Sequence, residues 1–246
     1  MVARKRRRWL RRQAPETGAT GAPYWLYGRH AVGAAVDNPE RRIVTLLSTA
    51  GIAPDGADIV TAEVLSAQLP KDAVHQGVAA LVQPLPEAEL APILGTDAPL
   101  VVLDRVSDPR NVGAVMRSAA AFGAAAIILP SRHAPSESGA MAKAASGALE
   151  RLPLIRVTNL SRSLAQVAEA GFWLLGLDAA ATRSLAEAAP VRRSALVLGA
   201  EGAGLRRLTA EACDELVRLP IGDAVESLNV SAAASAALYE IVRLSP

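Results

Sequence analysis

Three short segments of the chain combine polar side chains with glycines that let a ligand approach the backbone. They cover residues 104–117, 198–204 and 219–231. The first holds Asn111 and Arg117, the second Glu201, and the third Ser227 and Asn229. Amide, carboxylate, hydroxyl and guanidinium groups can together orient a hydroxyl or a carboxylate and stabilise charge on oxygen. These five polar residues could act on a ligand in this way.

The first segment predicts a capped helix that starts just after a buried strand. Asp108 is a good N-cap and Pro109 suits the first helical position, so Asn111 falls in the first turn. Arg117 lies about two turns into the same helix, and a separation of six residues does not place two side chains on one helix face. Asn111 and Arg117 can meet only through the reach of the arginine, an irregular first turn, or a subunit interface.

The second and third segments are less specific when each is taken alone. Gly199, Gly202 and Gly204 follow an apolar run, and glycine lets the backbone come close to a ligand. The loop lacks the G-x-G-x-x-G pattern of dinucleotide-binding folds, and an ordinary glycine-rich turn fits it equally well. In the third segment Ser227 is a natural helix N-cap, followed by Asn229 and an alanine-rich helix that can pack closely on a neighbour. A capped, buried helix of small residues is the simpler interpretation of that segment.

Residues from 100 onward alternate between apolar runs and helix-like stretches, which favours a mostly parallel sheet covered on both faces. Strands are predicted at 100–103, 125–129, 154–157, 173–177, 195–198 and 216–219. Helices are predicted at 109–122, 137–149, 160–170, 183–189, 208–214 and 227–243. Ligands of such sheets bind beyond the carboxyl ends of the strands, where all three segments fall.

The rest of the chain divides by composition into a tail, a small module and a linker. Helix is expected at 31–36 and strand at 43–48 and 78–82, and four prolines mark the stretch 84–99. We predict an α/β protein with these parts: a basic tail over 1–22, a small α/β domain over 23–84, a linker over 85–98, and an α/β domain over 99–246.

The charge is distributed unevenly. Residues 1–12 hold seven arginines and lysines and no acid, whereas the remainder carries 19 basic and 24 acidic residues, a net charge of −5. Such a tail suits phosphate binding, and a solvated extension without a role fits it as well. Four further arginines near the three segments form a candidate basic patch: Arg110, Arg132, Arg206 and Arg207.

Other features exclude several classes of protein. No apolar run reaches the length of a membrane span, and no apolar stretch follows the basic N-terminus as in a secretory signal. A single cysteine, Cys213, forms neither a disulfide nor a zinc cluster, and the three histidines are scattered. We expect a cytoplasmic protein without a membrane partner or a metal.

In combination and order, the three segments resemble the motifs of the SpoU/TrmH family of RNA 2′-O-ribose methyltransferases. The resemblance covers about 148 residues, and residues 27–32 (Tyr-Gly-Arg-His-Ala-Val) and 75–78 (His-Gln-Gly-Val) extend it to the RNA-recognition domain of the bacterial large-subunit rRNA subgroup. It implies a trefoil-knotted C-terminal domain, a homodimer, and S-adenosylmethionine bound largely by backbone groups. The cofactor-lining residues implied by the motif match are Gly199, Ala200, Leu219, Ile221 and Leu228.

The reaction implied by the resemblance is methyl transfer to a ribose 2′-oxygen, with a guanosine of 23S rRNA as the expected target. Because a guanidinium stays protonated, we expect Arg117 to act electrostatically or on a phosphate, not as a base. Asn111, Glu201 and Asn229 would orient it and the substrate, with help from Ser227. His30 and His75 of the module are expected to be structural in preference to touching RNA.

Three alternatives remain open on the sequence. The first keeps the reaction and changes the substrate to a guanosine of tRNA. The second is an RNA-binding assembly factor that has lost catalysis. It is disfavoured because the motif residues are all present: Asn111, Arg117, Glu201 and Asn229. The third is a Rossmann-type nucleotide enzyme, which the missing phosphate-binding fingerprint disfavours.

Overall fold

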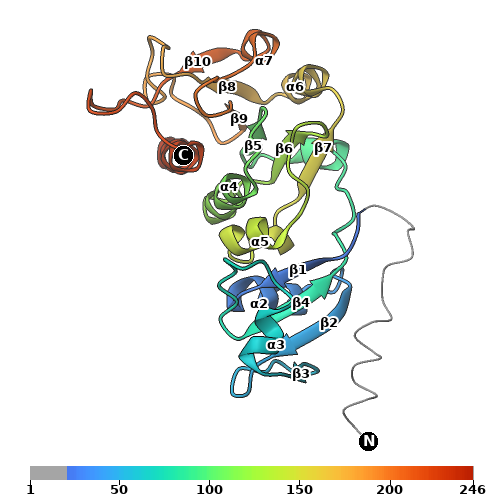
Figure 1. The fold of residues 1–246 in the computed structure, drawn as a ribbon. Coiled ribbons are helices and arrows are strands. Elements are labelled where there is room, and N and C mark those ends of the chain that lie inside the picture. The colour runs from blue at the N-terminus through green and yellow to red at the C-terminus, as the bar shows by residue number, and fades with distance from the viewer. Residues whose placement is uncertain (1–20, 246) are drawn as a thin grey trace, which may run out of the picture.

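The computed structural model describes residues 21–245 and contains two sheets (Figure 1). The predicted basic segment 1–12 lies outside the described residues. The smaller sheet has the order β1-β4-β2-β3, with β4 antiparallel to both β1 and β2. Its strands are β1 (Tyr24–Tyr27), β2 (Ile43–Ser48), β3 (Asp58–Ile59) and β4 (Val78–Val82), and its helices are α2 (Arg29–Asp37) and α3 (Ala62–Ser66). We call residues 23–84 the module.

The larger sheet is parallel throughout and has the order β10-β8-β9-β5-β6-β7. Its strands are β5 (Leu100–Leu103), β6 (Ala126–Pro130), β7 (Leu154–Val157), β8 (Trp173–Leu177), β9 (Ser194–Leu198) and β10 (Glu215–Val217). The helices around it are α4 (Pro109–Ala121), α5 (Gly139–Ala145), α6 (Leu160–Glu169), α7 (Arg207–Glu211) and α8 (Val230–Leu244), with short 3-10 turns η1 (Ala91–Gly95) and η2 (Ala148–Glu150).

Both faces of this sheet are buried, as continuous apolar strands require. Along β5 the side chains alternate: Val101 and Leu103 join the core beneath α4, α5 and α8, whereas Leu100 and Val102 join the core beneath α6. The predicted α/β class and the predicted strands of the larger sheet are thus confirmed, with shifts of one or two residues at the ends. Among the described residues no helix is long and apolar enough to cross a membrane.

One predicted helix is wrong. Residues 183–189 form a turn, because the Glu187 carboxylate accepts hydrogen bonds from the Ser184 backbone N–H and hydroxyl at 2.7 and 2.8 Å. These local bonds compete with helix formation. The chain there also runs beside the end of β10, since Ser184 forms an isolated parallel bridge with Arg218.

The limits of three other helices differ from the prediction, and the first of these, expected over 208–214, is α7 and ends at Glu211. The stretch expected to be helical over 137–149 is interrupted at Ser146 and Gly147, which both have positive φ and end α5 before η2. The last helix begins at Val230, and its N-cap is Asn229 instead of the expected Ser227. Asn229 Oδ1 accepts from the Ser231 backbone N–H at 2.9 Å, so the amide occupies the capping position.

The module packs directly on the larger domain. α5 lies between α4 and β1 (Figure 1), and a Cβ on Gly139 at the start of α5 would collide with the Trp25 carbonyl and the Tyr27 ring. A single apolar cluster contains buried residues of the module, such as Leu26 and Val82, together with residues of α4 and α5. The contact is therefore close and includes a shared apolar core.

A buried ionic network crosses the same contact. Arg41 of the module donates through Nε to Glu150 Oε2 at 2.9 Å and through Nη1 to Glu137 Oε2 at 3.1 Å. The Arg41 side chain is fully buried, and that of Glu150 is 3% exposed. Tyr24 donates to Glu137 Oε2 at 2.8 Å, and burial and the Glu137 charge raise the pKa of its phenol. The network fixes the orientation of the module on the larger domain.

Candidate active site

The start of α4 is built as the sequence predicts. Asp108 Oδ1 accepts from the Arg110 backbone N–H at 2.9 Å, and Pro109 occupies the first helical position. The first turn is regular, since the Val112 N–H donates to the Asp108 carbonyl at 3.1 Å. Asn111 therefore lies at the carboxyl edge of the parallel sheet, just beyond β5.

The glycine loop that follows β9 is closely folded on itself. The Gly204 N–H donates to the Ala200 carbonyl at 2.9 Å, and a Cβ on Gly199 would collide with Gly204 and the backbone nitrogen of Leu205. Gly202 and Gly204 both have positive φ, which favours glycine. The loop therefore requires glycine at position 199 and presents its backbone at the edge of the sheet.

A residue that the sequence analysis missed anchors the end of this loop. Asp104 follows β5 and is 1% exposed, and its carboxylate accepts from Arg206 Nε at 2.7 Å and from the Arg206 backbone N–H at 3.2 Å. The sequence shows Asp104 only as an acid that follows a strand. Its role could not be predicted because its partner, Arg206, lies 102 positions later. The bond joins the loops after β5 and β9.

Three of the predicted residues meet at this edge. Glu201 Oε1 accepts from the side-chain amide of Asn111 at 3.0 Å and from that of Asn229 at 2.6 Å. Asn229 Nδ2 also lies 3.1 Å from Asn111 Oδ1, which accepts from it. We call these three residues the amide–carboxylate cluster. It is open to solvent, so a substrate can reach it.

The other two candidate catalytic residues lie outside the cluster. Arg117 is exposed two turns along α4, and Ser227 is exposed in the loop before α8. None of the hydrogen bonds found among residues 21–245 joins either side chain to the cluster. Because the first turn of α4 is regular, two routes remain by which Arg117 can meet Asn111: its own reach and a subunit interface.

The candidate cofactor residues follow two strands of the same sheet. Gly199 and Ala200 come directly after β9, and Leu219 and Ile221 follow β10. Leu219 packs partly against the core, and Leu228 is 37% exposed in the loop before α8. Backbone from a glycine turn beside partly exposed aliphatic side chains suits a ligand with a flat apolar ring and polar edges. Within residues 21–245 no cluster of His, Cys, Asp and Glu offers a metal site.

The expected basic patch is largely neutralised within the chain. Arg110 pairs with Asp72, Arg206 with Asp104, and Arg207 with Glu211, each at 2.7 Å. His75 is also satisfied internally: its Nδ1 accepts from the Gly77 N–H at 3.0 Å, and its Nε2 lies 3.1 Å from the Ser66 hydroxyl. That arrangement supports a structural His75, whereas His30 is exposed.

Comparisons with known proteins cover both parts of the chain. A profile of the SpoU rRNA Methylase family matches residues 98–239. A protein of Vibrio vulnificus named 23S rRNA (guanosine-2′-O-)-methyltransferase RlmB is 39% identical over 238 residues, which cover 89% of this chain and 96% of that protein. The RlmB protein of Escherichia coli K12 is 44% identical over 176 residues, covering 70% of this chain and 72% of its own length.

A solved structure agrees with the fold. The SpoU methyltransferase AviRb of Streptomyces viridochromogenes, in complex with the cofactor AdoMet, has a TM-score of 0.73 and 27% identity, covering 90% of this chain and 89% of that one. The expected knotted α/β domain with a mostly parallel sheet is consistent with this match and with the strand order described above.

Proposed function

The chain belongs to the SpoU rRNA Methylase family, and on that premise we propose that it methylates the ribose 2′-hydroxyl of a guanosine in 23S rRNA. The methyl donor is S-adenosylmethionine, whose sulfonium supplies an activated methyl group. The Vibrio vulnificus relative, which matches over both the module and the larger domain, carries the name of this activity. We also place the protein in the cytoplasm, where ribosomal RNA is modified in bacteria.

The observation that carries the proposal is the meeting of three sequence motifs on one carboxylate oxygen. Asn111 comes from the first turn of α4, Glu201 from the loop after β9, and Asn229 from the start of α8. Parallel sheets bind ligands at this edge. A fixed arrangement of two amides and a carboxylate can hold a ribose hydroxyl in one orientation, and orientation alone supplies a large share of the acceleration in group transfer.

The cofactor would be held by Gly199, Ala200, Leu219, Ile221 and Leu228. Gly199 supports this role through the shape of the loop, because a Cβ there would collide with the backbone of Gly204 and Leu205 and open the turn. Leu219, Ile221 and Leu228 supply apolar contacts, and Leu228 is sufficiently exposed to be covered by a ligand. Ser227, exposed next to Leu228, would assist the cluster in orienting the substrate.

Arg117 would provide positive charge where the ribose oxygen loses its proton, or bind a phosphate beside it. Its place on α4 favours an arginine donated by a partner subunit, and we propose a homodimer on this ground. An apolar surface lies near it: Tyr239 of α8 is 54% exposed and packs edge-on against Phe122 at the end of α4, with ring centroids 6.1 Å apart. We propose that a second copy covers this surface and that its Arg117 acts at the cluster.

Titration with S-adenosylmethionine and mapping of 2′-O-methyl groups test the proposal together. The purified protein is expected to bind the cofactor and to transfer its methyl group to a 23S rRNA transcript but not to tRNA. A deletion strain should lack one 2′-O-methylguanosine in 23S rRNA. Loss of a 2′-O-methyl group from tRNA instead would show that the substrate is a tRNA. Absence of S-adenosylmethionine binding would indicate a non-catalytic assembly factor.

A further inference from the structure

A row of cationic side chains lies where the module meets α4 and α5. The cations are Arg29 at the start of α2, Arg110 at the start of α4 and Lys143 on α5. Asp72 and Gln76, in the loop that precedes β4, are their hydrogen-bond partners. We call this surface the seam. We propose that substrate RNA crosses from the module to the amide–carboxylate cluster along the seam, with backbone phosphates on Lys143, Arg29 and Arg110. This inference rests on the proposed function and names the path of its substrate.

The seam is continuous with the candidate active site. Arg110 adjoins Asn111, whose amide donates to Glu201. Arg110 Nη2 in turn reaches Asp72 Oδ2 at 2.7 Å, four positions before Gln76 in the same loop. Gln76 Oε1 accepts from Lys143 Nζ at 2.6 Å and from the Arg29 backbone N–H at 3.2 Å. Hydrogen bonds and an ion pair, joined by short stretches of the same chain, thus lead from the cluster to the module.

Lys143 is a cation of the seam whose hydrogen-bond partner carries no charge. Its ammonium is partly buried, and burial lowers its pKa, yet within residues 21–245 it pairs with no carboxylate. Its partner is the neutral amide of Gln76. Gly28 has positive φ, and a Cβ there would collide with Lys143 Nζ, so the backbone gives the ammonium its room. The amide of Gln76 does not neutralise the ammonium, and a bound phosphate would supply the missing negative charge.

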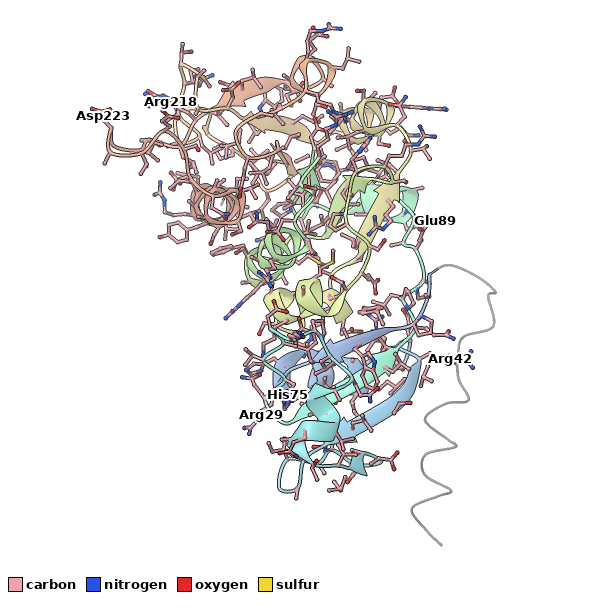
Figure 2. All side chains as sticks on the ribbon, in the orientation of Figure 1. Arg29, Arg42, His75, Glu89, Arg218 and Asp223 are labelled. Carbon is pink, nitrogen blue, oxygen red and sulfur yellow. The ribbon has the colours of Figure 1, made fainter. Side chains whose placement is uncertain are left out.

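The two arginines of the seam are accessible. Arg29 is exposed, and Figure 2 shows it on the same side of the module as His75, well separated from Arg42. The side chains of Arg110 and Asp72 are 68% and 69% exposed. An ion pair so exposed contributes little to stability, so a phosphate can replace the Asp72 carboxylate on Arg110.

The rigid contact between the module and the larger domain fixes the position of the seam relative to the cluster. Arg41 holds Glu137 and Glu150 in the buried network, and Gly139 brings α5 against β1 without a gap. The start of α2, which carries Arg29, therefore keeps a fixed position relative to Asn111. A single RNA strand can then meet both parts of one protomer without a change in their arrangement.

The salt dependence of RNA binding tests the path. Affinity for a 23S rRNA transcript would be measured from low to moderate salt for the full chain, for Lys143→Gln, for Asp72→Asn and for the control Arg42→Gln. Lys143→Gln is expected to bind several-fold more weakly and to lower the slope of log affinity against log salt by about 1, as for one lost phosphate contact. Asp72→Asn is expected to bind more tightly, because it releases Arg110. Arg42→Gln should match the unmodified chain, and Lys143→Arg should restore binding.

Each other outcome is informative. If Lys143→Gln keeps the original affinity and slope, or if Arg42→Gln weakens binding as much, the path along the seam is wrong. Titration with S-adenosylmethionine distinguishes failure of the path along the seam from failure of the proposed function. A chain that binds RNA along the seam without taking up the cofactor supports the path and contradicts the methyl transfer, whereas a chain that takes up the cofactor but does not bind RNA overturns the path.

Discussion

The side-chain amide of Asn229 donates to Glu201 Oε1 at 2.6 Å, which ties the start of the last helix to the loop that ends β9. The same amide group caps α8 through its oxygen, which accepts from the Ser231 N–H. One side chain thus both begins a helix and positions a carboxylate. A change at either residue is expected to alter the cluster without unfolding the sheet.

Replacing Glu201 by alanine should remove the common acceptor of Asn111 and Asn229. We expect kcat for methyl transfer to fall about 100-fold, equivalent to roughly 2.7 kcal/mol in the barrier, while the glycine loop keeps its own backbone bond between Gly204 and Ala200. Steady-state kinetics with a 23S rRNA transcript would measure it. Glu211→Ala, which removes only an exposed pair with Arg207 on α7, is the matched control. A kcat within twofold of the original chain would contradict the role of Glu201.

Mixing two inactive variants tests whether Arg117 acts across a subunit interface. Arg117→Ala and Asn229→Ala homodimers should each be inactive. After subunit exchange, a mixed dimer has one site with an intact Asn229 and an intact partner arginine, so activity should return to about a quarter of the original at equal mixing. Activity that never returns, despite exchange shown by native mass spectrometry, would place the arginine within its own subunit.

A conservative change refines the role of the same residue. Arg117→Lys keeps the charge but not the planar fork of donors, and it should lose most of the methyl transfer if the guanidinium contacts two oxygens at once. Single-turnover rates would measure the loss. Near-normal rates in Arg117→Lys would show that Arg117 contributes its positive charge and not the geometry of its guanidinium.

Gly199→Ala should weaken cofactor binding. The added Cβ meets the backbone of Gly204 and Leu205, which cannot move as a flexible side chain does, so the loop must open. Calorimetric titration with S-adenosylmethionine is expected to show at least tenfold weaker binding. Gly33→Ala on α2 is the control, because nothing lies within 4 Å of its added Cβ; it should leave binding intact and raise stability by about 0.5 to 1 kcal/mol, as alanine does in helices. Equal affinities in both variants would exclude the glycine loop from the cofactor site.

Arg41→Met should destabilise the protein strongly. It leaves Glu137 and Glu150 without their cation in a buried setting, and removal of one partner of such a pair costs about 3 to 5 kcal/mol. Denaturant unfolding would show the loss as a lower midpoint. Replacing the exposed Arg243, which pairs with Glu240 on α8, should shift the midpoint little. A similar midpoint for both variants would show that the buried network contributes no more than a surface pair.

Cys213 should be unreactive in the native protein. Burial, followed by the charges of Asp214 and Asp104, raises the pKa of its thiol to about 12, so the reactive thiolate is scarce at pH 8. A raised pKa favours the protonated thiol in the fold; this contribution to stability is present below about pH 9 and is lost as the pH rises toward 12. Labelling with an alkylating reagent should be slow in buffer and fast in denaturant. Rapid native labelling would contradict the raised pKa of this partly buried thiol.

The sequence was sufficient for features that depend on neighbouring residues. Apolar runs located the strands of the parallel sheet, and the pair Asp108–Pro109 located the start of α4, since caps and buried strands are encoded locally. The turn at 183–189 was missed because one carboxylate, Glu187, outweighs the helical tendency of its neighbours. Contacts between distant positions were also missed: Asp104 with Arg206, and Lys143 with Gln76. The resemblance of the three segments to the motifs of the SpoU/TrmH family, and not their spacing, predicted that Asn111, Glu201 and Asn229 belong to one site.

The apolar cluster shared by the module and α4 and α5 has a consequence for any attempt to divide the chain. A cut in the proline-rich stretch before β5 would leave Leu26 and Val82 facing water in one fragment, and the α5 surface that packs on β1 in the other. Neither fragment would keep its own interior closed, and both would tend to aggregate. Expression of the larger domain alone is therefore a poor route to a smaller enzyme, and melting of the full chain should occur in one cooperative step.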